Sequence, residues 1–122
     1  MGILSGEVYF VNLDPVIGRE QGGTRPVVVV SRDEINSKPL VVQVVPGTSG
    51  ARVRNDYPWN ARVPAGEGNL PRETVFLAFQ ARAVDQSRFP DVPHGTLSPG
   101  ALAAVERALV CVFQLENIGP TP

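Results

Sequence analysis

A chain of 122 residues is long enough for one folded domain and short for two. Hydrophobic residue types make up 43% of it and charged types 19%, a balance that excludes an intrinsically disordered chain. The net charge of −1, from 11 basic and 12 acidic residues, excludes a protein that binds nucleic acid through bulk positive charge.

Six short extended segments can be predicted, and the first two lie in the first quarter of the chain. Residues 6–13 carry apolar side chains on both alternating faces, which predicts a strand buried on both sides. Residues 26–31 include four consecutive valines and predict a second strand. Residues 31–37 then predict one helical turn, with Ser31 as its N-cap and acidic residues in its first turn.

The other four extended segments follow in the middle of the chain. Residues 40–45 form a β-branched run that we expect to stop at Pro46-Gly47. Residues 54–63 alternate weakly around aromatic side chains, whereas residues 74–79 alternate well. Residues 81–84 predict a continuation of that strand after a kink.

The last predicted element is a helix that begins after Ser98. Serine is a preferred N-cap, Pro99 suits the first helical position, and apolar residues then recur at helical spacing. They are Leu102, Val105, Leu109, Val112 and Phe113. The elements together predict a mainly β fold, a small SH3-like antiparallel β-barrel with a short helical insert and a C-terminal helix. We expect one domain over residues 1–122, with a core over about 6–115 and a tail over 116–122.

Cysteine and histidine are too scarce for several kinds of site. The single Cys111 excludes an intrachain disulfide framework and a cysteine-based zinc site. The single His94 lies in a stretch rich in proline and glycine, with no nucleophile motif that points to it. No apolar run approaches the roughly 18 residues of a membrane span, and residues 1–7 do not resemble a signal peptide. We therefore expect a cytoplasmic protein with no membrane partner.

Two loops carry the candidate site residues. In residues 18–26, glycines permit sharp turns, and Arg25 precedes the valine strand at a position suited to a phosphate clamp. In residues 45–50, Thr48 and Ser49 offer hydroxyls that can donate to a phosphate oxygen. Each loop also has a purely structural interpretation: an exposed arginine beside a hairpin, and hydroxyls that stabilise a turn.

Together, the two loops make the chain resemble the MazF/PemK toxin family over about residues 6–115. The shared motifs follow the family's order and spacing. They are Gly6-Glu7-Val8-Tyr9, Asp14-Pro15, Gly18, Glu20-Gln21-Gly22, Arg25-Pro26-Val27-Val28-Val29, Pro46-Gly47-Thr48-Ser49 and Thr96-Leu97-Ser98-Pro99.

The resemblance implies the toxin of a type II toxin–antitoxin system, which cuts single-stranded mRNA at specific sequences without a metal or another cofactor. The 2′-hydroxyl of the RNA attacks the adjacent phosphorus and leaves a 2′,3′-cyclic phosphate and a 5′-hydroxyl. In this reaction Arg25 would stabilise the charged phosphorus, and Thr48 would donate its hydroxyl to the same phosphate. Glu20 is the candidate base, because the pKa of an arginine is too high for that role. Alternatively, Glu20 binds loop amides or pairs with Arg19 or Arg25.

The remaining candidate residues are assigned to RNA binding. They are Arg19, Gln21, Ser49, Arg52, Arg54, Gln80 and Arg82. Family members often carry an aspartate where this chain has Phe79, so that position has no acid–base role here and is either a core aromatic or a stacking platform for a base. Residues 52–59 suit splayed bases or form a surface hairpin. We expect the arginines at positions 19, 25, 52, 54 and 82 to gather in one groove.

The resemblance also implies binding partners, and two alternative functions stay open. The resemblance implies a homodimer with RNA across the interface, and an antitoxin whose flexible acidic tail occupies the RNA groove. One alternative is a non-catalytic toxin of the same fold that binds DNA gyrase through a tryptophan near its C-terminus, whereas the only tryptophan here is Trp59. The other alternative is a barrel that only binds RNA or a peptide.

Overall fold

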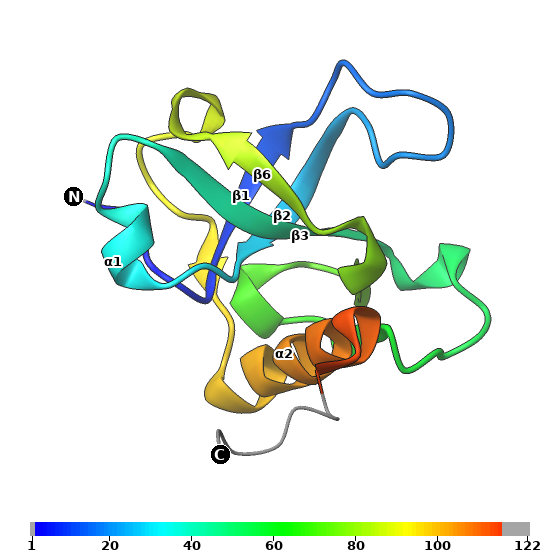
Figure 1. Ribbon diagram of the computed structural model, residues 1–122. Helices are drawn as coiled ribbons and strands as arrows, with labels where there is room; N and C mark the ends of the chain where they lie inside the picture. Colours follow the sequence, from blue (N-terminus) through cyan, green and yellow to red (C-terminus); the bar gives the residue numbers. More distant parts are fainter. Residues whose placement is uncertain (1, 116–122) are drawn as a thin grey trace, which may run out of the picture.

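The computed structural model describes residues 2–115, which form one curled antiparallel sheet with a helix packed against it (Figure 1). The strands are β1 (Glu7–Asn12), β2 (Thr24–Val29), β3 (Val41–Ser49), β4 (Asn60–Val63), β5 (Thr74–Leu77), β6 (Arg82–Asp85) and β7 (Gly95–Thr96). The helices are α1 (Asp33–Asn36) and α2 (Pro99–Phe113), and four 3₁₀ turns span Gly50–Arg52, Glu67–Asn69, Ala78–Gln80 and Gln86–Arg88. The predicted mainly β class with a short helical insert and a C-terminal helix is confirmed; the predicted tail lies outside the described residues.

Strand β3 is the central element, because it pairs with three other strands. Its first half pairs with β6 on one side, its middle pairs with β2, and its last residues, Gly47 to Ser49, pair with β5. The predicted end of this strand at Pro46-Gly47 is therefore wrong. Gly47 lies where β5 comes closest, since a Cβ added there would stand 2.8 Å from the Thr74 methyl and 3.1 Å from the Phe76 ring. Glycine thus allows the strand to continue instead of ending it.

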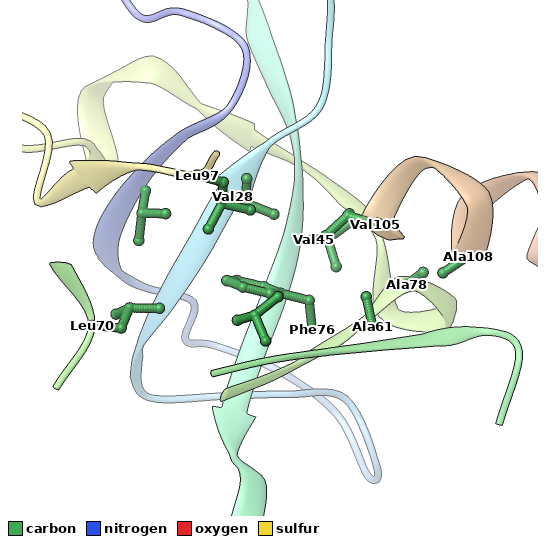
Figure 2. Packing of buried hydrophobic residues seen from close by; sticks show 11 residues of the cluster. Val28, Val45, Ala61, Leu70, Phe76, Ala78, Leu97, Val105 and Ala108 are labelled. Atoms are coloured by element: carbon green, nitrogen blue, oxygen red, sulfur yellow. The ribbon is translucent and has the colours of Figure 1, made fainter. Parts of the chain in front are cut away.

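Apolar side chains are buried on both faces of the sheet. One cluster lies under α2 and is centred on Phe76, with Val105 and Ala108 reaching it from the helix (Figure 2). The other cluster lies on the opposite face and is built largely from valines of β1, β2, β3 and β6. Strand β1 gives Val8 to the first cluster and Tyr9 to the second, so the predicted burial of this strand on both faces is confirmed.

Helix α2 begins as its sequence predicts. The Ser98 hydroxyl accepts a hydrogen bond from the Ala101 amide at 3.2 Å, and Pro99 is the first helical residue. The Glu67 carboxylate accepts bonds from both the amide and the hydroxyl of Ser98, at 3.0 and 2.9 Å. These contacts fasten the start of the helix to the turn before β5.

Two sequence predictions fail for local reasons. The strand predicted over 54–63 begins only at Asn60, because Tyr57 and Trp59 are exposed and stack on each other instead of alternating between core and solvent. Ser31 is not the N-cap of α1, a position held by Arg32. The Ser31 hydroxyl is instead buried, where it donates to Asn36 Oδ1 at 2.5 Å and accepts from the Gln43 amide at 3.0 Å.

The predicted kink after β5 is confirmed, and it shapes the surface described below. The 3₁₀ turn Ala78–Gln80 separates β5, which pairs with both β3 and β4, from β6, which pairs with β3 and no longer with β4. Phe79 and Gln80 project from this turn rather than from a strand.

Two long loops lie at the same end of the molecule (Figure 1). We call them the glycine-rich loop (residues 13–23) and the arginine loop (residues 50–59).

Candidate active site

Arg25 and Thr48 meet on neighbouring strands. Val27 of β2 pairs with Pro46 of β3, and two residues further along this antiparallel register Arg25 lies beside Thr48. The Arg25 Nη1 donates to Thr48 Oγ1 at 3.2 Å, and its Nε donates to the Gly22 carbonyl at 2.7 Å. Thr48 is only 8% exposed, so this side chain lies below the surrounding protein surface and has little freedom to move.

This pair lies in a cleft of about 410 Å³ between the glycine-rich loop and the arginine loop. The lining contains three arginines and no carboxylate. It consists of Gln21, Arg25, Thr48, Arg52, Val53, Arg54, Asn55, Tyr57, Trp59, Asn60, Leu77 and Phe79. A cleft lined by charge of one sign attracts ligands of the other sign, so this one favours an anionic ligand.

The cleft arginines are not neutralised by nearby carboxylates. Within residues 2–115, the ion pairs involve only Arg32, with Glu34, and Arg62, with Asp56 and Glu73. Hydrogen bonds to Asp56, and then to Glu73, raise the pKa of Arg62. Among the described residues, the guanidinium groups of Arg25, Arg52 and Arg54 thus form no ion pair, and a guanidinium suits the bidentate binding of a phosphate.

Aromatic rings and unpaired acceptors complete the cleft. The Tyr57 and Trp59 rings stack with centroids 4.7 Å apart and planes 5° apart, and the half-exposed Phe79 also lines the cleft. Gln21 Oε1 and Asn60 Oδ1 are buried, and neither has a hydrogen-bond partner among the described residues. A buried acceptor without a partner costs about 1–3 kcal/mol, which a ligand that donates a hydrogen bond would recover.

A second hollow of about 560 Å³ adjoins the cleft and shares Gln21 and Phe79 with it. We call it the side hollow; its other lining residues are Pro15, Glu20, Gln80, Ala81 and Arg82. Glu20 Oε1 accepts a hydrogen bond from the Ile17 amide at 2.6 Å, within the glycine-rich loop. Arg82 Nη1 donates to the Leu13 carbonyl at 3.0 Å, at the base of the same loop.

The structure brings most of the predicted site residues together. Arg25, Thr48, Gln21, Arg52 and Arg54 share the cleft, whereas Glu20, Gln80 and Arg82 lie in the side hollow. Two candidates lie apart from both. Arg19 lines neither cavity, and Ser49 lines a small apolar hollow of about 200 Å³ beside Phe10 and Pro26.

Sequence reasoning missed what Gln80 does in the fold. Its Oε1 accepts from the Gln21 amide at 3.3 Å, and its Nε2 donates to the Arg19 carbonyl at 3.2 Å. One side-chain amide thereby fastens the glycine-rich loop to the turn after β5. No spacing rule could have found this contact, because the partners are about 60 residues apart. The sequence does not single out Asn60 either, because its pattern predicts this residue only as one among others in a strand over 54–63.

Among residues 2–115, no three histidine, cysteine, aspartate or glutamate side chains lie together in a way that could hold a metal ion. Neither of the described helices combines the length and the apolar composition needed to cross a membrane.

Comparison with known proteins gives one family. Residues 4–113 match the family described as PemK-like, MazF-like toxin of type II toxin–antitoxin system. The endoribonuclease EndoA of Bacillus subtilis is 33% identical over 91 residues, which cover 75% of this chain and 78% of that protein. The endoribonuclease MazF of Staphylococcus epidermidis is 32% identical over 115 residues, 94% of each chain.

Solved structures agree with that match. A crystal structure of MazF from Deinococcus radiodurans superposes with a TM-score of 0.77 at 28% identity, covering 93% of this chain and 98% of that one. An endoribonuclease from a mycobacterial species, solved with its cognate antitoxin, superposes with a TM-score of 0.74 at 22% identity, covering 98% and 99%. The latter likeness concerns the fold alone.

Proposed function

The chain belongs to the PemK-like, MazF-like toxin family of type II toxin–antitoxin systems, and from that premise we propose that it is an endoribonuclease that cuts single-stranded mRNA at specific sequences. The observation that carries this proposal is the contact of Arg25 with Thr48 on the floor of a cleft lined by arginines and no carboxylate. Two relatives that are about a third identical to it are named endoribonucleases. The enzyme class follows from these two relatives.

The proposed reaction needs neither a metal nor a protein nucleophile. The 2′-oxygen of the RNA forms a bond to the adjacent phosphorus, the bond to the 5′-oxygen breaks, and a 2′,3′-cyclic phosphate and a 5′-hydroxyl result. Negative charge accumulates on the non-bridging phosphate oxygens in the transition state. Arg25 and Thr48, already in contact, would donate to these oxygens without rearrangement, which is the condition under which such donors accelerate a reaction most.

Glu20 is the proposed base that accepts the proton of the 2′-hydroxyl. It is the one carboxylate among the residues that line the cleft and the side hollow. Its Oε1 is held by the Ile17 amide, which would orient the carboxylate for the proton transfer. The leaving 5′-oxygen takes up a proton from solvent water, and Glu20 afterwards returns its proton to the solvent, so that no net proton is gained or lost.

RNA binding is proposed for the cleft, for the side hollow and for the small hollow that contains Ser49. Arg52 and Arg54 would bind flanking phosphates, and the stacked pair of Tyr57 and Trp59 offers an aromatic face to a splayed base. Phe79 is half-exposed at the junction of the two cavities, a position that suits stacking better than a core role. Further contacts are assigned to Arg19, Gln21, Ser49, Gln80 and Arg82.

The proposed partners follow from the charge of the cleft and from the family. Crystal structures of a MazF from Deinococcus radiodurans include complexes with MazE, and the mycobacterial relative was solved with its antitoxin. We infer an antitoxin whose flexible acidic tail fits the same acid-free, arginine-lined cleft. A homodimer with RNA across its interface, acting in the cytoplasm, is proposed on the same basis.

A cleavage assay tests the proposal. Long single-stranded RNA is incubated with the protein in EDTA, and both new ends of each product are identified. We expect cuts at a small set of sequences, cyclic phosphate and 5′-hydroxyl ends, and loss of cutting in Arg25→Ala. Failure of the wild type to cut, or equal cutting by Arg25→Ala, would contradict the mechanism. Growth arrest without RNA cleavage would favour the gyrase-binding alternative, and RNA binding without cleavage the non-catalytic barrel.

A further inference from the structure

The arginine loop contributes six residues to the lining of the cleft, yet the hydrophobic core does not hold the loop in place. Residues 51–59 are exposed apart from Val53, which is half-buried. The loop is a long excursion between β3 and β4 with a single 3₁₀ turn at its start. A loop with so little buried apolar surface has low local stability unless polar contacts fix it.

One side chain supplies those polar contacts. Arg62 Nε donates to Asp56 Oδ1 at 2.8 Å, and Nη2 donates to the Val53 carbonyl at 2.6 Å. Nη1 donates to the Gly50 carbonyl at 3.1 Å and to Glu73 Oε1 at 2.9 Å. The guanidinium thus contacts the start, the middle and the later part of the loop, and ties all three to the residue just before β5.

The sequence places Arg62 on the correct side of β4 for this role. Its neighbours Ala61 and Val63 are buried in the core beneath α2, so the alternation of a strand directs Arg62 to the opposite face. The fit there is close, since a Cβ added to Gly50 would stand 2.3 Å from Glu73 Oε1 and 3.0 Å from Arg62 Nη1. A Cβ at position 50 would therefore force the Glu73 side chain to move from its place beside Arg62.

We infer that Arg62 is the positioning residue of the arginine loop: it fixes the backbone that presents Arg52, Arg54, Tyr57 and Trp59 to the RNA. Four of its five N–H groups are already used within the protein, and it does not line the cleft. Its effect on the substrate therefore passes through the loop. The expected effect of Arg62 on RNA rests on the proposed function. Its expected effect on the order of the arginine loop does not depend on that function.

Two readouts separate positioning from general stability. The first is the split between KM and kcat, together with the set of sequences that are cut. In Arg62→Gln we expect KM to rise by about 10- to 100-fold, because small displacements of binding groups have effects of that size. We expect kcat to change less and the cleaved sequences to become more varied. Arg62→Lys should not rescue KM, because an ammonium keeps the charge and loses the planar fork.

The second readout does not require RNA. Trp59 is the only tryptophan of the chain and lies at the end of the loop, so its fluorescence anisotropy and its quenching by acrylamide report loop order directly. We expect lower anisotropy and stronger quenching in Arg62→Gln than in wild type. The matched control is Arg32→Gln, which removes an arginine whose only ion pair is exposed, with Glu34 at 3.7 Å on α1.

The outcomes distinguish the two proposals. A wild type that does not cut RNA would contradict the proposed function. Altered Trp59 fluorescence in Arg62→Gln would still support the positioning role in that case. Normal Arg25-dependent cutting, with fluorescence, KM and cleaved sequences of Arg62→Gln equal to those of Arg32→Gln, would overturn the positioning role. If Arg62→Gln does not fold, Asp56→Asn decides, because it removes one exposed anchor of the loop: a rise in KM and in quenching supports the role, and no change in either overturns it.

Discussion

The Arg25 guanidinium donates to the Thr48 hydroxyl at 3.2 Å across the junction of β2 and β3. The donor and the acceptor come from residues 23 positions apart, and each lies near the end of a strand that contributes several fully buried valines to the core. The pair therefore has little freedom to reorganise. A preorganised pair of this kind stabilises developing charge at low cost, which is the basis of the first prediction.

Replacing Thr48 by valine should remove the hydroxyl and preserve the shape of the side chain. We expect kcat to fall by about 10²- to 10³-fold, the usual effect of losing one donor to a transition-state oxyanion. Thr48→Ser is the matched control, since it keeps the hydroxyl, and it should retain most of the activity. Rates with a single RNA of known cleavage site check this prediction. A loss of activity in Thr48→Ser with activity retained in Thr48→Val would mean that packing of the methyl group, not donation by the hydroxyl, is what matters.

Asn60 should show opposite effects on stability and on RNA binding. Its Oδ1 is buried in the cleft without a partner among the described residues. Asn60→Ala would remove that unpaired acceptor, so the free energy of unfolding should stay unchanged or rise by about 1 kcal/mol. The KM for RNA should rise, because a donor on a base would lose its acceptor. Urea unfolding and cleavage kinetics measure the two effects; a fall in stability with an unchanged KM would contradict the prediction.

The sequence predicted the strands and the helix wherever one local signal dominated. Three of the four consecutive valines, residues 27–29, are fully buried in β2, and the Ser98-Pro99 pair begins α2. The predicted end of β3 at Pro46-Gly47 is wrong because a local rule treats these two residues as the end of a strand. The close approach of β5 to Gly47, which no local pattern contains, lets the strand continue.

The same limit applies to the site. Arg25 and Thr48 were found because their motifs are short and ordered, and the strand register then brings them together. The supporting residues Gln80 and Arg62 act through partners far along the chain or through main-chain carbonyls. Because every residue has a main-chain carbonyl, the sequence does not show which of them accepts a given hydrogen bond, and the three-dimensional structure is needed to find it.

Two phenylalanines three positions apart should differ sharply in their contribution to stability. Phe76 is fully buried at the centre of the core beneath α2, whereas Phe79 is 50% exposed at the cleft (Figure 2). Phe76→Ala should lower the free energy of unfolding by about 3–5 kcal/mol through lost burial and a residual cavity. Phe79→Ala should change it by only about 0.5 kcal/mol and should weaken RNA binding instead. Similar stability losses in both variants would show that Phe79 belongs to the core.

Tyr9 should make the protein sensitive to alkali. Burial, and then the hydrogen bond that its hydroxyl donates to Glu7 Oε1 at 2.8 Å, raise the pKa of Tyr9 well above its ordinary value of 10. The folded state therefore holds the proton after the unfolded state has released it. On this account the free energy of unfolding is independent of pH below about pH 10 and falls above it, by up to about 1.4 kcal/mol per pH unit.

Tyr9→Phe separates this effect from the other groups that titrate in alkali. The variant keeps the ring, which packs edge-on against Phe89 with centroids 5.1 Å apart, and loses the ionisable hydroxyl. It should be less stable at neutral pH by about 1 kcal/mol, the usual net value of a hydrogen bond. Its stability should then decline less steeply than that of the wild type above about pH 10. Tyr57→Phe is the control, because Tyr57 is exposed and its slope should match the wild type. Urea midpoints across this pH range decide the matter: parallel declines in wild type and Tyr9→Phe would show that the buried tyrosine is not the group responsible.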